Sequence, residues 1–361
     1  MNSSSKLLLF FFSIILFASC GNADDDVNYA LNTGDGLGKG QPVDKCLDLG
    51  DNELVLSIQD QYTTAPGKVS IFFKVSNSEG SPVSGLTADQ FTIYEQGRND
   101  DCFNTISPSE SQARISPNEQ IFSSNTLLIL DLSNSVLSES VDELKAASIS
   151  FIDAVMPATS QESYKMAIYW FDGEDILHEL TPLTSDKSDL TAAIETINKD
   201  ISSDVSTDLY GAVIKATDKA SDLLKDSTKG DKIGAASVVI FTDGTDQASR
   251  YAKDAAQKKV DTADPNISFF TIGLGSEIDT QVLSDLGKNS SEFAANKDEL
   301  EDTFNRISEI VSERANSFYL FEYCSPKRGG DNNLAIQVKN GSLQGAVQTK
   351  FSAEGFTGGC E

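Results

Sequence analysis

Apolar and polar residues alternate with a period of two at both ends of the chain, and this pattern predicts two groups of β-strands. The expected strands near the beginning are residues 54–58, 69–75 and 91–94, and those near the end are residues 318–323, 334–338 and 346–351. Gly, Pro and Ser residues separate them, as is usual at turns. Three strands cannot form a sandwich alone. We therefore expect the two ends to fold together into one small module of about six or seven strands.

Between these ends, apolar runs typical of buried strands alternate with stretches of helical spacing. Strands are expected at residues 125–131, 164–171, 176–180, 235–242, 267–272 and 292–294, and helices at 138–155, 190–197, 209–224, 247–260, 278–286 and 300–314. This alternation predicts an α/β fold, in which helices cover both faces of a Rossmann-like parallel sheet. The expected domains are a β-rich module at 51–121, the α/β domain at 122–315 and a β-rich segment at 316–361 that completes the module.

Oxygen-bearing side chains follow two of the predicted strands. Asp131, Ser133 and Ser135 come directly after an apolar run, Thr207 precedes a helix, and Asp243 ends a second apolar run. The carboxyl ends of parallel strands meet at one edge of a sheet, where ligands bind. Separately, the first aspartate could cap a helix and the last could form a turn. Together the five side chains predict a site for Mg²⁺ or Mn²⁺, because these cations prefer hard oxygen ligands.

The same segments, Asp-x-Ser-x-Ser, then Thr before Leu-Tyr-Gly, then Thr-Asp-Gly, resemble a von Willebrand factor type A (VWA) domain over about residues 122–315. In that family the constellation is a metal-ion-dependent adhesion site (MIDAS). The resemblance implies that Asp131, Ser133, Ser135, Thr207 and Asp243 bind one divalent cation. It also implies that a partner protein supplies an Asp or Glu to complete the coordination. We expect Asp131→Ala to abolish metal binding and to leave the fold intact, because the site lies at the rim of the sheet.

Two other segments carry weaker signals, one a resemblance and one a predicted helix cap. Residues 75–91 resemble the strand–turn–strand pattern of Ig-like modules in bacterial surface proteins. Asp246, close to the last site residue, is expected to be the N-cap of the following helix, with a role beside the metal as the alternative.

The N-terminus predicts export. Lys6 precedes an apolar run at residues 7–18 that is too short to span a bilayer and fits a secretory signal. Residues 16–21 resemble a lipobox, which implies a signal peptide at 1–19, acylation of Cys20 and a lipid anchor in the bacterial outer membrane. The alternative is an ordinary signal peptide with an incidental cysteine. Residues 20–50 have the composition of a flexible tether.

The tether contains a run of three aspartates at residues 24–26. Such runs resemble the surface-export signals of some Gram-negative lipoproteins, and a merely solvated tether is an equally good interpretation. The sequence therefore predicts a lipoprotein of the cell envelope and leaves open which face of the membrane it occupies.

Four cysteines remain after Cys20. An even number in an exported chain predicts disulfides, and three pairings are possible. We favour Cys46–Cys102 and Cys324–Cys360, because each pair falls within one of the two β-rich ends.

Charge and the scarcity of histidine exclude several functions. The formal net charge is -27, from 28 Lys and Arg and 55 Asp and Glu residues, and it disfavours nucleic acid as a partner. The one histidine, His178, lies in an expected edge strand and is expected to face solvent. No Gly-x-Ser-x-Gly or His-Glu-x-x-His motif is present. We therefore expect a non-enzymatic protein that binds an acidic partner, or alternatively an envelope scaffold that binds a sister protein through the same metal.

Overall fold

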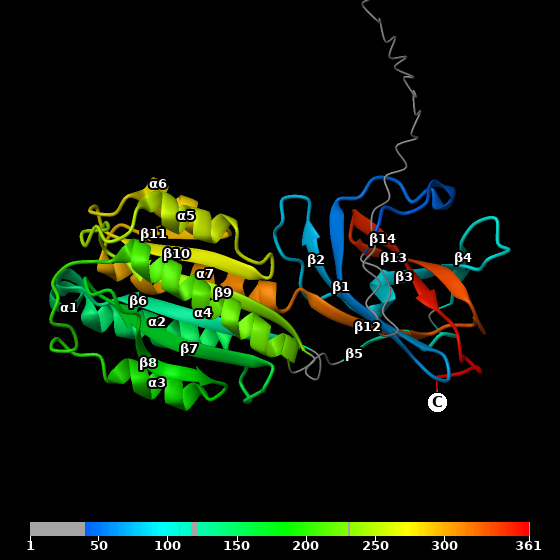
Figure 1. Cartoon of the computed structure of the whole chain (residues 1–361), viewed down its shortest axis with the longest axis horizontal. Helices are drawn as coiled ribbons and strands as arrows, with labels where there is room; N and C mark the ends of the chain where they lie inside the picture. Colours follow the sequence, from blue (N-terminus) through cyan, green and yellow to red (C-terminus); the bar gives the residue numbers. More distant parts are fainter. Residues whose placement is uncertain (1–39, 108, 117–121, 230–231, 361) are drawn as a thin grey trace, which may run out of the picture.

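A computed structural model describes residues 40–107, 109–116, 122–229 and 232–360 (Figure 1). The chain forms an α/β unit and an all-β unit that lie end to end along the long axis of the molecule. The predicted signal peptide, Cys20 and the acidic run fall outside the described residues. Within the described residues, no helix has the length and apolar character needed to cross a membrane.

The α/β unit is built on one six-stranded sheet with the order β11-β10-β9-β6-β7-β8. The strands are β6 (Phe122–Asp131), β7 (Tyr164–Phe171), β8 (His178–Thr184), β9 (Ile233–Thr242), β10 (Ile267–Leu274) and β11 (Ser290–Ala294). All neighbours are parallel except β7 and β8, which are antiparallel. The central strands are buried along nearly their whole length, which explains why they are apolar runs and not alternating sequences.

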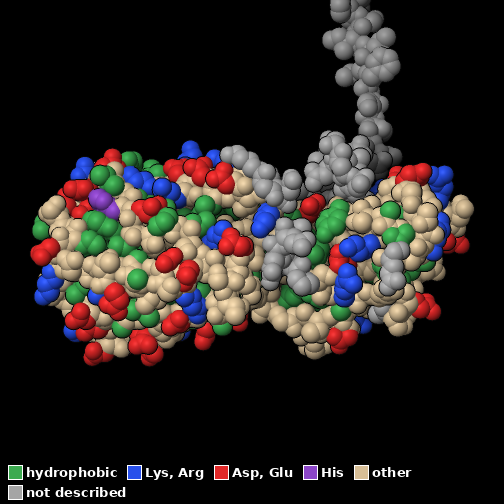
Figure 2. All heavy atoms as spheres, turned by 90° about the horizontal axis from the view of Figure 1, so that it is seen from below, with side chains coloured by type: hydrophobic (Ala, Val, Ile, Leu, Met, Phe, Trp, Pro, Cys, Tyr) green, Lys and Arg blue, Asp and Glu red, His purple; other side chains and the backbone are tan. Residues whose placement is uncertain are grey.

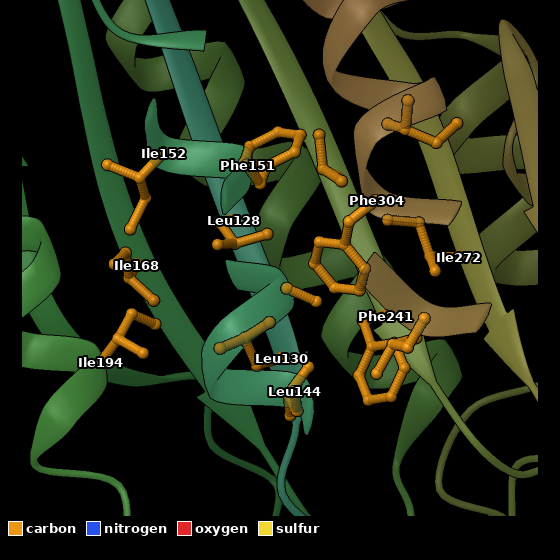
Figure 3. Close-up of a cluster of buried hydrophobic side chains, with 14 of the residues drawn as sticks. Leu128, Leu130, Leu144, Phe151, Ile152, Ile168, Ile194, Phe241, Ile272 and Phe304 are labelled. Atoms are coloured by element: carbon orange, nitrogen blue, oxygen red, sulfur yellow. The ribbon is translucent and has the colours of Figure 1, made fainter. Parts of the chain in front are cut away.

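Helices cover both faces of this sheet. They are α1 (Asn134–Glu139), α2 (Val141–Val155), α3 (Lys187–Glu195), α4 (Leu209–Lys229), α5 (Lys253–Asp261), α6 (Thr280–Leu286) and α7 (Leu300–Ala315). On one face, α2, α3 and α7 pack against side chains such as Leu128, Ile168 and Phe241 (Figure 3). On the other, α4, α5 and α6 pack against the alternate residues of the same strands. The domain is therefore a three-layer structure with one core on each side of the sheet.

Two expected helices have different bounds. The helix expected at 138–155 begins earlier and is interrupted at Ser140, which separates α1 from α2. The helix expected at 247–260 begins only at Lys253, and residues 247–252 form a loop. The loop is stabilised by backbone contacts, because Thr207 O accepts hydrogen bonds from the amides of Gln247 and Ala248. These two backbone amides therefore donate to another loop and do not belong to the first turn of a helix.

The all-β unit is a sandwich made from both ends of the chain. One sheet has the order β1-β2-β12-β5 and the other β14-β13-β3-β4. The strands are β1 (Leu54–Thr64), β2 (Lys68–Asn77), β3 (Phe91–Gln96), β4 (Asn104–Ile106), β5 (Arg114–Ser116), β12 (Phe318–Cys324), β13 (Asp331–Asn340) and β14 (Leu343–Ser352). Backbone pairing of β2 with β12 and of β3 with β13 places the first and last segments in the same sheets.

Two features stabilise the sandwich. Its core contains apolar side chains of both sheets, among them Phe73, Phe91 and Phe321. The disulfides are Cys46–Cys102 and Cys324–Cys360, which confirms the pairing favoured from the sequence. The short strands β4 and β5 were not expected, because each has only three residues and no clear alternation.

Residues 40–50, which composition assigned to the tether, contact the sandwich. Gln41 and Gln348 exchange two backbone hydrogen bonds, of 2.7 and 2.9 Å. Asp44 N donates to Gln348 Oε1 at 2.8 Å, and Cys46 is disulfide-bonded. The chain therefore joins the sandwich from residue 40 onward.

Aromatic residues pack where the two units meet. Phe318 at the start of β12 lies 4.7 Å from Phe122 at the start of β6 and 5.8 Å from Phe72 in β2, between ring centroids. All three side chains are buried. Beyond this junction, acidic and basic side chains are scattered over the visible face and do not gather in one patch (Figure 2).

Candidate metal centre

The sheet order brings the two site aspartates together. Strands β6 and β9 are parallel neighbours, with Leu130 paired to Phe241. Asp131 therefore ends its strand beside Thr242, and Asp243 follows directly. This edge faces away from the sandwich, at the end of the molecule marked by α1 (Figure 1).

Asp131 is fully buried. Its Oδ1 accepts a hydrogen bond from Ser133 N at 2.9 Å, and its Oδ2 accepts one from Thr242 Oγ1 at 2.6 Å. Burial, together with the negative charge of Asp243, raises the pKa of this carboxyl to about 7. The site lies at the rim of the sheet as expected, but Asp131 itself is buried there. Asp131→Ala would remove the acceptor of both hydrogen bonds.

The two serines connect the aspartates. Ser133 is the N-cap of α1, and its Oγ lies 3.3 Å from Ser135 Oγ. Ser135 Oγ donates to Asp243 Oδ1 at 2.9 Å. Adjacent ligands of an octahedral Mg²⁺ ion with bonds of about 2.0–2.1 Å are separated by roughly 2.9 Å. The spacing of these oxygens therefore fits neighbouring positions around such a cation.

Thr207 approaches from a separate loop. Its side chain is buried, and its carbonyl accepts the amides of residues 247 and 248, which follow Asp243. Asp208 N donates to Asp172 O at 2.8 Å and ties the loop to the end of β7. Among the described residues, no hydrogen bond joins the Thr207 hydroxyl to the other four site residues.

Asp246 does not cap the following helix, whose N-cap is Ala252. Its carboxylate instead accepts hydrogen bonds from Tyr210 N at 3.1 Å and Ser249 N at 3.0 Å. It therefore satisfies an amide in the first turn of α4, a different helix. This contact connects the Thr207 loop with the loop after Asp243.

The electrostatics of the site favour a cation. In the part of the chain that the structure describes, no Lys or Arg forms an ion pair with Asp131 or Asp243. Burial raises the pKa of Asp243, and the charges of Glu277 and Glu139 raise it further. A buried carboxylate beside a second, partly buried carboxylate is unfavourable when no counter-charge is present. A divalent cation would supply the missing charge, so the residues present fit the metal that the sequence predicted.

An open hollow of about 400 Å³ adjoins the site. Its lining includes Ser135, Asp243, Gly275 and Glu277. The one cation in the lining, Lys297, is paired with Glu143 at 2.8 Å. Solvent and a partner side chain can therefore reach the outer side of the site.

Sequence reasoning missed one residue that contacts a site residue and one that lies close to a site residue in the sequence. Thr242 belongs to the Thr-Asp-Gly motif but not to the predicted ligand set, and it donates a hydrogen bond directly to Asp131. Its position at the end of a strand next to β6 was the available signal. Val205, with 70% of its surface exposed, lies two residues before Thr207 and was not noted. Large exposed apolar side chains are informative near a binding site.

Comparisons with known proteins agree with this fold. The family model described as von Willebrand factor type A domain matches residues 125–311, and no curated protein matches the chain. The solved structures that are similar to this chain include the following three. The conserved hypothetical protein BatB from Bacteroides thetaiotaomicron is 18% identical over 54% of this chain and 99% of its own, with a TM-score of 0.41. Proximal thread matrix protein 1 from the mussel byssus, with a zinc-occupied MIDAS motif, is 15% identical over 53% of this chain and 48% of its own (TM-score 0.44). The manganese-loaded TRAP protein of Plasmodium vivax is 13% identical over 67% of this chain and 97% of its own (TM-score 0.42).

Proposed function

Because this chain belongs to the von Willebrand factor type A family, we propose that it binds a protein partner through one divalent cation, Mg²⁺ or Mn²⁺. The cation would be held by Asp131, Ser133, Ser135, Thr207 and Asp243. The observation that carries the proposal is the convergence of one buried carboxylate, one partly buried carboxylate and two hydroxyls at ligand spacing. Among the described residues, no basic side chain forms an ion pair with either carboxylate.

The hydroxyl and carboxylate residues would have different roles in such a site. Ser133, Ser135 and Thr207 contribute neutral hydroxyls, which lower the negative charge of the ligand set compared with a site made only of carboxylates. Both oxygens of Asp131 accept protein hydrogen bonds. These bonds orient the serine segment, and the carboxylate adds negative charge to the site. When bound, the cation supplies a positively charged position that can accept a carboxylate oxygen from outside. An Asp or Glu of the partner would fill it.

The surface beside the site suits a protein partner. Val205 is 70% exposed and Ile176 is 51% exposed, and both belong to loops at this end of the domain. Apolar side chains around a charged centre are typical of binding sites that desolvate a central contact. The acidic hollow would repel a carboxylate in the absence of the cation, which makes binding dependent on metal.

The arrangement of the two ends of the molecule supports our proposal for the cellular role. Described residues 40 and 41 lie on the sandwich, and the metal centre lies at the opposite end. Anchored through Cys20, an outer-membrane lipoprotein of this shape would present the site away from the membrane. We propose a surface role in adhesion, with a scaffold role in the envelope as the alternative, and no enzymatic activity.

Calorimetry with Mg²⁺ and Mn²⁺ tests the metal site on the full chain in detergent. Asp243→Asn should weaken uptake at least tenfold, and Asp331→Asn, an exposed residue of the sandwich, is the matched control. Unchanged uptake in Asp243→Asn would contradict the proposal.

Crosslinking on intact cells, with Mn²⁺ or with EDTA, tests the partner. Crosslinks that vanish with EDTA and in Asp243→Asn are expected, and metal-independent crosslinks would contradict the mechanism. Cleavage by protease added to intact cells would favour adhesion, and resistance would favour the scaffold role.

A further inference from the structure

A second group of metal-ligating side chains follows strand β7. Asp172, Glu174 and His178 each offer one ligand atom, and these atoms all lie within 4.8 Å of one another. None of them belongs to the five residues of the centre described above. The group occupies the connection between β7 and the edge strand β8, which begins at the histidine.

His178 does not face solvent freely, contrary to the expectation from the sequence. Its ring stacks on Trp170 with a centroid distance of 3.9 Å and an interplanar angle of 9°. Its Nε2 atom is buried and finds no hydrogen-bond partner among the residues that the structure describes. A buried polar atom without a partner is unfavourable unless a ligand satisfies it.

Glu174 Oε2 lies 3.6 Å from this nitrogen. That separation is too long for a hydrogen bond. It is close to the spacing of two ligands on one tetrahedral Zn²⁺ ion, roughly 3.3 Å for bonds of about 2.0–2.1 Å. The pair is therefore arranged as two ligands would be, and not as a donor and an acceptor.

Asp172 is held in place from behind. Its side chain is buried, Oδ1 accepts a hydrogen bond from Glu174 N at 2.8 Å, and Oδ2 accepts one from the Ser202 hydroxyl. Each carboxylate oxygen keeps a second lone pair for a metal. Partners of this kind orient the ligands in metal sites.

We propose that Asp172, Glu174 and His178 form a second, distinct cation site that binds Zn²⁺ or a similar borderline transition metal, with a fourth position open to water. Imidazole nitrogen combined with carboxylate oxygen selects such metals over Mg²⁺. This proposal does not depend on the proposed adhesive function.

The position of the site gives it a structural role beside the first. Asp172 O accepts the amide of Asp208, next to Thr207, and Gly173 O accepts two hydrogen bonds from the Arg250 guanidinium, at 2.7 and 2.9 Å. A metal ion bound to the 172–178 loop would therefore restrict the movement of a segment that is hydrogen-bonded to the loops around the first centre.

The only tryptophan in the chain provides the readout, because Trp170 stacks on the proposed ligand. The full-length protein is titrated with Zn²⁺ by calorimetry and with Co²⁺ by tryptophan fluorescence, both in excess Mg²⁺. Wild type should take up one Zn²⁺, and Co²⁺ should quench the fluorescence. Glu174→Gln and His178→Gln should each weaken Zn²⁺ uptake at least tenfold, and in the absence of Zn²⁺ they should leave Mg²⁺ uptake unchanged.

Asp243→Asn separates the two sites. It should lose Mg²⁺ and keep both Zn²⁺ uptake and Co²⁺ quenching. The proposal is overturned if wild type takes up no Zn²⁺ at micromolar concentration, if both glutamine variants still bind it, or if only Asp243→Asn loses it. Glu174 is partly exposed, so its variant keeps the test valid should the histidine variant fold poorly.

Discussion

In metal-free protein, Asp131→Asn should increase the free energy of unfolding at pH 8. Asp131 ionises at about pH 7 in the folded chain and near its ordinary value of 3.8 when unfolded. Between these values the folded state binds more protons than the unfolded state, so stability falls as pH rises. Raising the pKa of Asp131 from 3.8 to about 7 corresponds to roughly 4 kcal/mol of folding stability, and all of this stability is lost above pH 7.

Asparagine can keep most of the local hydrogen bonds. Its oxygen can accept from Ser133 N, and its amide can donate to Thr242 Oγ1. The threonine proton can then turn to Gly244 O, which lies 3.3 Å away. Allowing about 1 kcal/mol for imperfect replacement, we expect a net gain of about 2–4 kcal/mol at pH 8. For a domain of this size, that corresponds to a rise in Tm of roughly 5–10 °C.

Scanning calorimetry in EDTA at pH 8 and pH 5 measures this effect, with Asp331→Asn as the control. The difference between variant and wild type should shrink at pH 5, where Asp131 is protonated. Saturating Mg²⁺ at about 100 times its Kd should stabilise wild type by about 2.7 kcal/mol and should not stabilise the variant. A variant that melts below wild type in EDTA at pH 8 would refute the reasoning, since it would make the charged carboxylate a stabilising group.

Three further predictions concern the sandwich and its junction. Glu322 is paired with Lys68 and Arg114, both at 3.0 Å; burial raises its pKa, but hydrogen bonds from a serine and the two cations outweigh burial and bring it to about 2. Glu322 therefore contributes up to about 3 kcal/mol to the free energy of unfolding. This contribution is complete above pH 4.5 and is lost as pH falls toward 2. Stability of Glu322→Gln should consequently fall less steeply with pH in that window, and the variant should have a lower urea midpoint at pH 7. Phe318→Ala should lower the free energy of unfolding by about 3–4 kcal/mol and speed proteolysis at the junction. Mg²⁺ affinity should stay unchanged, because the metal centre lies at the opposite end of the α/β unit; a weaker affinity would contradict this expectation. Arg314→Met should raise stability by about 1 kcal/mol, because the Arg314 Nε is buried without a partner, and a lower melting point would argue that the charge is needed.

Much of the fold follows from local pattern. The apolar runs of β6 and β9 and the spacing of α2 and α7 indicated their elements within a few residues, because burial on a sheet or helix face imposes a period that one segment reveals alone. The helix expected at 247–260 failed for a non-local reason, since amides of that segment bond to Thr207 O from another loop.

The sequence by itself determined which chemistry the metal centre could have, because residue type and position after a strand restrict Asp131, Ser133, Ser135 and Asp243 to hard-oxygen coordination. Only the tertiary structure decided their electrostatic state. The hydrogen bond from Thr242 to Asp131 joins residues 111 apart, and it exists because β9 was placed next to β6. Burial, and hence the pKa of about 7, depends on that sheet order. The stacking of Trp170 on His178 likewise required the turn that brings β8 back against β7, and the period within either strand does not encode that pairing.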